Sequence, residues 1–83
     1  MAEHGTLQLV IASVGETRFS GDALSVTLPG EVGEMTILPH HEPMVTTLKR
    51  GIITVRTKDS EDKKFEVEGG VFEMSGNRAV VLL

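Results

Sequence analysis

The feature that most constrains the fold of this chain is the alternation of apolar and polar side chains at every second residue, in short runs. In the clearest run, Leu24, Val26 and Leu28 are separated by smaller or polar residues. Successive side chains of a β-strand point to opposite faces, so this spacing predicts a half-buried strand. About eight such β segments are separated by turn residues at intervals of roughly 8 to 12 residues, and no stretch is left for a helix. The pattern predicts one all-β sandwich or barrel domain over residues 1–83.

Several local assignments follow from the same alternation. Residues 13–18 are interpreted as a polar turn and residues 19–21 as a short kinked piece. The runs at 52–58 and 65–68 flank a charged turn at 59–63, which predicts a hairpin. The apolar positions of the alternating runs should form the core, and those singled out are Leu24, Val26, Phe65, Val67, Phe72 and Val81.

Residues 28–51 interrupt this regularity. The stretch holds all three prolines and two of the three histidines. Proline lacks a backbone donor and glycine accepts positive φ, so the chain must turn repeatedly here. One interpretation is a shaped surface for a partner, and the other is a simple connection between two sheets. The pattern alone favours the connection.

Composition narrows the possible partners. The formal charge is −4, from 12 acidic against 8 basic residues, which argues against binding to the phosphates of nucleic acids. There is no cysteine, and no apolar run approaches the roughly 20 residues of a membrane span. Glu3 stands where a secretory signal carries basic residues, so we expect a soluble chain without such a signal.

Reactive side chains form no convincing site. His40, His41 and Glu42 are adjacent, whereas two histidines that chelate from one strand should be two residues apart. His4, near the N-terminus, offers little as a third ligand. No nucleophile has a base in a recognisable arrangement, so we expect no catalytic residue, no metal site and no cofactor. Two hypotheses remain, a docking subunit of a larger assembly and a stand-alone binding module.

A set of motifs in order along the chain favours the docking subunit, with the stand-alone binding module as the alternative. LQLVIAS, FSG, VTLPGEVGEMTILPHHEP, TTLKRGIITVR, FEVEGGVFEMSGN and AVVLL, from Leu7 to Leu83, resemble the N-terminal β-sandwich domain of the ATP synthase epsilon subunit. The resemblance implies a flattened sandwich of about ten short strands, so about eight to ten short antiparallel strands are expected. It also implies a non-catalytic role in the central stalk, coupling ion flow to ATP synthesis.

The partners implied by the resemblance are the gamma subunit and the polar loops of the c-ring. The complex would be peripheral to the membrane, without inserting into it, on the ATP-synthesising side, which is the cytoplasmic face in a bacterium. Matching motif positions gives a loop that faces the c-ring, made of Glu31, Gly33, Glu34 and Met35. The positions that match the gamma-facing side of the family are Ser13, His41 and Thr46.

The sequence departs from the family pattern at three positions near these residues and at its end. Thr36 and His40 stand where the family usually has glycine, and Glu42 replaces alanine. If the backbone is left-handed there, Thr36 and His40 each cost about 1 kcal/mol or more. The family continues beyond the position of Leu83 into two antiparallel helices that inhibit ATP hydrolysis, so that inhibition is not assigned to this chain. Glu34 is expected to be exposed in the free domain.

Overall fold

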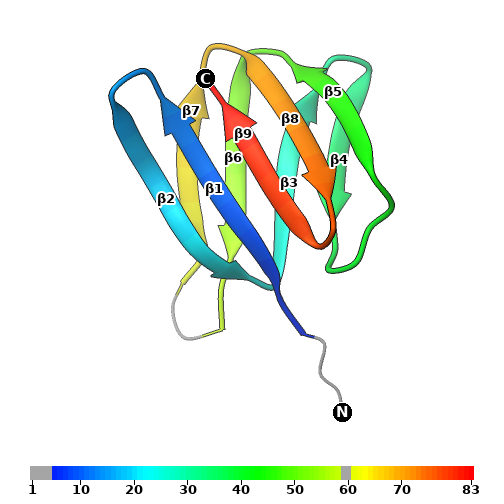
Figure 1. The fold of residues 1–83 in the computed structure, drawn as a ribbon. Helices are drawn as coiled ribbons and strands as arrows, with labels where there is room; N and C mark the ends of the chain where they lie inside the picture. Colours follow the sequence, from blue (N-terminus) through cyan, green and yellow to red (C-terminus); the bar gives the residue numbers. More distant parts are fainter. Residues whose placement is uncertain (1–4, 59–60) are drawn as a thin grey trace.

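The structure is a computed structural model that describes residues 5–58 and 61–83. Within these residues it contains nine strands and no helix (Figure 1). The predicted all-β class is confirmed, with the strand number inside the expected range. The strands are β1 (Leu7–Ser13), β2 (Glu16–Ala23), β3 (Ser25–Gly30), β4 (Gly33–Ile37), β5 (Met44–Leu48), β6 (Gly51–Arg56), β7 (Lys63–Val67), β8 (Gly70–Ser75) and β9 (Arg78–Leu82).

The strands form one sheet that folds back on itself into two layers. Their order is β2-β1-β9-β8-β5-β3-β6-β7, and β4 pairs with the remaining edge of β3. β5 and β3 share only the pair Gly30–Leu48, so the sheet bends at this point. We call β2-β1-β9-β8-β5 the first layer, which lies in front in Figure 1, and β4-β3-β6-β7 the second layer. The pairings are antiparallel apart from β1 and β9, which run parallel.

The core fills the space between the two layers, because the alternating apolar residues of both layers point inward. Val26, Val67, Phe72 and Val81 are buried, as predicted. No buried polar or charged residue occurs among those described. The other buried apolar residues are Leu7, Leu9, Ile11, Ala23, Leu28, Ile37, Leu48, Ile53, Val55, Met74 and Ala79.

Two predicted core residues are only partly buried, so the prediction was wrong for them. Leu24 lies in the bend between β2 and β3, where the smaller Ala23 takes the inward position. Phe65 lies on β7, at the open edge of the second layer. Its ring meets that of Phe19 on the opposite edge strand β2, with centroids 6.3 Å apart and planes at 72°. This edge-to-face pair partly closes the side of the sandwich where no strands pair.

The first hairpin is longer than predicted. The turn is limited to Val14 and Gly15, and β2 then runs without interruption from Glu16 to Ala23. β2 is an edge strand with most side chains exposed, so it carries no apolar alternation that sequence analysis could detect. A register shift between Ile11 and Ala12 accommodates one extra residue. The predicted hairpin of β6 and β7 is confirmed, and residues 59–60 of its tip lie outside the described part of the chain, as does His4.

Candidate functional site

The outward side of the first layer carries a group of apolar side chains in two adjoining rows, with Glu73 between two of them. In one row across the strands, Ala12 pairs with Leu82 and Leu82 with Val71. In the next row, Val10 pairs with Val80, and Val45 follows beyond Glu73. Leu82 is 56% exposed and Val45 is 69% exposed, and the others are exposed in part. We call this surface the apolar face, and its residues are Val10, Ala12, Val45, Val71, Val80 and Leu82.

The outward side of the second layer is polar. Thr27 pairs with Thr36 on one side and with Thr54 on the other, and the two hydroxyl oxygens of Thr27 and Thr36 lie 3.0 Å apart. Ile52, which is 49% exposed, stands opposite Glu66 on this side. We call this surface the polar face, and its other residues are Ser25, Arg56 and Lys64. Because a contiguous exposed apolar patch on a small domain marks an interaction site, the apolar face is the first candidate for docking.

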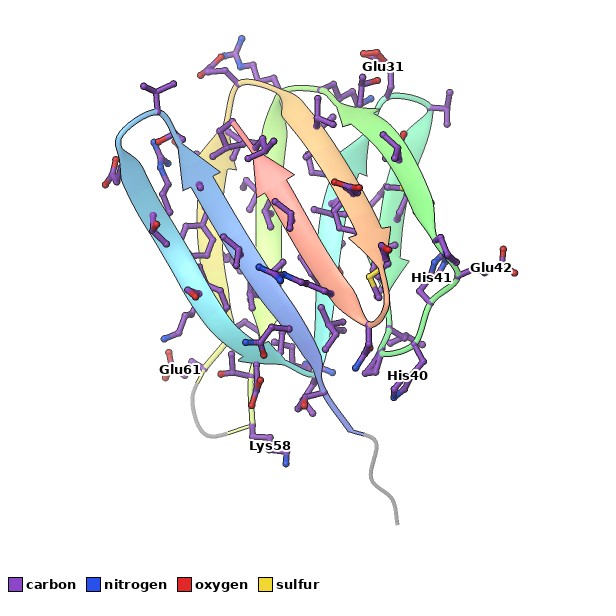
Figure 2. All side chains as sticks on the ribbon, in the orientation of Figure 1. Glu31, His40, His41, Glu42, Lys58 and Glu61 are labelled. Carbon is purple, nitrogen blue, oxygen red and sulfur yellow. The ribbon has the colours of Figure 1, made fainter. Side chains whose placement is uncertain are left out.

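The three residues predicted to face gamma lie around the first layer without meeting one another. Ser13 ends β1, Thr46 lies on β5, and His41 is exposed on the loop that leads into β5. β9 and β8 lie between β1 and β5, so these strands are about 14 Å apart at the usual spacing between strands. Thr46 pairs with the buried Phe72, so its side chain lies on the inward side of β5, and Ser13 has the same parity on β1 as the buried Ile11. Ser13 and Thr46 therefore lie on opposite flanks of the first layer but not on its outward surface. His41 lies beside Glu42 and away from Glu31 (Figure 2).

The loop predicted to face the c-ring is the tip of the β3–β4 hairpin. Glu31 and Glu34 are exposed, and Gly33 has the positive φ of 150° that favours glycine. Met35 is partly buried and packs against the core, so its side chain anchors the hairpin. The backbone N–H of Glu31 donates to the carbonyl oxygen of Thr47 at 3.1 Å, which ties the tip to the first layer. The hairpin tip thus exposes two carboxylates, and the Met35 side chain and the hydrogen bond to Thr47 hold it in place.

Asn77 holds the loop that carries His41, and sequence analysis missed this role. The backbone N–H of His40 donates to Asn77 Oδ1 at 2.7 Å, and Asn77 Nδ2 donates to the carbonyl oxygen of Thr6 at 3.0 Å. The loop, the β8–β9 turn and the start of β1 are thereby joined through one side chain. His41 Nδ1 also lies 2.8 Å from the carbonyl oxygen of Glu42. Asn77 was recognisable only as a turn residue, because its partners are 37 and 71 positions away.

The concave surfaces of the molecule are open and shallow. One of about 500 Å³ is lined by Phe19, Lys58 and Lys63. A smaller one of about 260 Å³ lies on the outward side of the first layer between Glu73 and Arg78. Among residues 5–58 and 61–83, no three histidine, aspartate or glutamate side chains come together as metal ligands. No helix capable of crossing a membrane is found in the same residues.

Comparison with known proteins gives a consistent assignment. Residues 6–83 match the family described as "ATP synthase, Delta/Epsilon chain, beta-sandwich domain". The ATP synthase epsilon chain of Bordetella petrii is 38% identical over 77 residues, covering 93% of this chain and 55% of the relative. That of Delftia acidovorans is also 38% identical over 77 residues, covering 93% of this chain and 56% of the relative. The chain therefore spans about half the length of these relatives.

Solved structures show the same fold at lower identity. A chain of the Euglena gracilis mitochondrial ATP synthase, in a structure of OSCP, F1 and the c-ring, superposes with a TM-score of 0.87 at 20% identity. The match covers 94% of this chain and 50% of that one. A chain from the central stalk and c-ring of the Tetrahymena thermophila enzyme gives a TM-score of 0.77 at 12% identity, covering 90% of this chain and 60% of that one.

Proposed function

Because this chain belongs to the family of delta/epsilon chain β-sandwich domains of ATP synthase, we propose that it is a non-catalytic subunit of the central stalk, which binds gamma and contacts the c-ring. In this role it couples ion flow through the ring to ATP synthesis. It would act at the surface of a membrane-bound complex, on the ATP-synthesising side, without entering the bilayer. In a bacterium that side is the cytoplasmic face.

The observation that supports the proposal most is the difference in polarity between the two outer faces of this chain. The apolar face exposes Leu82, Val71 and Val45 over adjoining strands. Each valine or leucine buried at an interface contributes about 1.5 to 3 kcal/mol of transfer free energy, which is reduced by the cost of association. The polar face offers mainly threonine and charged side chains, which water already solvates. We therefore assign gamma to the apolar face. Ser13 and Thr46 lie on the strands that flank this face, and Thr46 points inward, opposite Phe72.

The c-ring is assigned to the end of the sandwich that carries Glu31 and Glu34. These exposed carboxylates suit polar and basic loops, and charges at the rim of an interface mainly set orientation and association rate. Figure 2 shows Glu31 at the end opposite His40 and Lys58. In this arrangement the subunit would bind gamma through one face and the c-ring through one end. A stalk subunit that rests on the ring needs two such separate surfaces.

Complex formation with gamma tests the proposal. The chain, in its natural full-length form, is mixed with the gamma subunit of the same organism and analysed by size-exclusion chromatography. We expect one peak that contains both proteins. Separate elution at micromolar concentrations of both would contradict the proposal and favour a stand-alone binding module.

A further inference from the structure

Two turns of the sandwich expose a valine almost completely. Val14, in the β1–β2 turn, is 99% exposed, and Val32, in the β3–β4 turn, is 98% exposed. Glycine, asparagine, aspartate, serine and proline are the residues that turns favour, since each has a local conformational reason to be there. Valine has none, and neither of these side chains touches the core. Folding therefore does not explain them.

The two tips share a tripeptide. Val-Gly-Glu occurs at residues 14–16 and again at 32–34, and nowhere else in the chain. In both places the glycine has positive φ, 77° at Gly15 and 150° at Gly33, and the glutamate that follows is exposed. The turns are not identical, because valine is the first of the two turn residues in one hairpin and the second in the other. What they have in common is a bare apolar side chain beside a carboxylate.

The strand pairings place both tips at the same end of the sandwich. β1 runs parallel to β9 and therefore antiparallel to β8, and β5 runs antiparallel to β8. The last residue of β5, Leu48, pairs with the last residue of β3, Gly30. The turns that follow β1 and β3 thus lie at the same end of the sandwich, at two of its corners (Figure 1).

From this arrangement we propose that the β1–β2 tip, Val14 to Glu16, is a second contact with the c-ring loops, acting beside the β3–β4 tip. The inference rests on the proposed function, which assigns only the β3–β4 tip to that partner. Each valine would enter a small apolar recess between neighbouring loops, and Glu16 and Glu34 would pair with basic or amide groups beside it. Two separate contacts at the corners resist tilting of the sandwich on the ring, which one contact does not.

Site-directed crosslinking tests the inference directly, because the described sequence contains no cysteine. The variants are Val14→Cys, Val32→Cys and, as a control at the opposite end, Lys58→Cys. Each is introduced into the full-length chain, assembled with the other subunits of its ATP synthase, labelled with benzophenone maleimide and illuminated. We expect crosslinks to the c subunit from both valine positions, at similar yield, and none from Lys58→Cys.

The outcomes separate this inference from the proposed function. A crosslink from Val32→Cys without one from Val14→Cys would overturn the second contact and leave the assigned function intact. Absence of both, in complexes that still contain gamma, would also overturn the assignment of this end to the ring. All three variants should retain the melting temperature of the parent, because the replaced side chains are exposed. A c-subunit crosslink from Lys58→Cys as strong as that from Val14→Cys would likewise contradict the inference.

Discussion

His40 has a left-handed backbone, with φ of 66°, where a residue with a Cβ atom is strained. It stands at one of the two positions at which the family usually has glycine. The cost expected for a side chain in this conformation therefore applies at His40. It does not apply at Thr36, which lies in extended β4 and places its hydroxyl oxygen 3.0 Å from that of Thr27.

Glycine at these two positions should therefore have opposite effects. His40→Gly should stabilise the domain by about 0.5 to 1 kcal/mol, since it relieves the left-handed strain and keeps the backbone hydrogen bond to Asn77. Thr36→Gly should destabilise it by about 1 kcal/mol, because glycine weakens a strand and the contact with Thr27 is lost. Urea unfolding of both variants and the parent measures the two differences. Destabilisation of the same size in both would show that the backbone at His40 is not left-handed.

At the scale of the elements, the approach of β9 to β8 depends on the glycine that begins β8. Gly70 has φ of 152°, and a Cβ atom there would lie 2.6 Å from the carbonyl oxygen of Leu82. Gly33 has nearly the same φ, 150°, but an added Cβ would meet nothing within 4 Å. The two glycines therefore share one conformational requirement and differ in the space around them.

Replacing Gly33 and Gly70 with alanine separates the cost of backbone strain from the cost of steric overlap. Gly33→Ala should lower the free energy of unfolding by about 1 to 3 kcal/mol through backbone strain alone. Gly70→Ala should lower it further, by about 1 kcal/mol or more, because β9 must also move away from β8. Chemical denaturation measures both losses. Equal losses would mean that the β8–β9 contact at Leu82 is looser than described.

Strands with one buried side were predictable from sequence, including the edge strand β7, and the largely exposed edge strand β2 was not. β3, β6 and the hairpin of β6 with β7 follow from alternation, because their two faces meet different surroundings. β2 shows no alternation, since water surrounds most of it, and Leu24 was assigned to the core because it continues a pattern that the bend interrupts. The apolar face has a signal that was available: the run AVVLL at residues 79–83 is apolar on both sides of its strand.

Other parts of the candidate site could not be predicted from the sequence. Asn77 acts on His40 and Thr6 through contacts that only the folded chain creates. The residues transferred from the family pattern, such as Ser13 and Thr46, have definite places on the first layer, and their contacts stay predictions. Strand pairing across the sheet, and not local pattern, decides which exposed residues become neighbours.

At the scale of the whole molecule, the sandwich has two unlike faces and one end with two carboxylate-bearing tips. The apolar face includes Leu82, flanked by Ala12 and Val71, and the polar face includes Ile52, which stands opposite Glu66. These two residues are similarly exposed, at 56% and 49%, and both lie on strands. A charge placed at either should have similar effects on folding, so they form a matched pair for testing which face binds a partner.

The affinity of the two aspartate variants for gamma is the measurement that tests the central claim most directly. The full-length parent chain, Leu82→Asp and Ile52→Asp are each titrated against gamma by calorimetry, after their melting temperatures have been compared. Leu82→Asp should weaken binding by about 30-fold or more, since about 2 kcal/mol is lost when an apolar contact becomes a buried, unpaired charge. Ile52→Asp should bind as the parent does. Unchanged affinity of Leu82→Asp together with a large loss for Ile52→Asp would place gamma on the polar face and contradict the account.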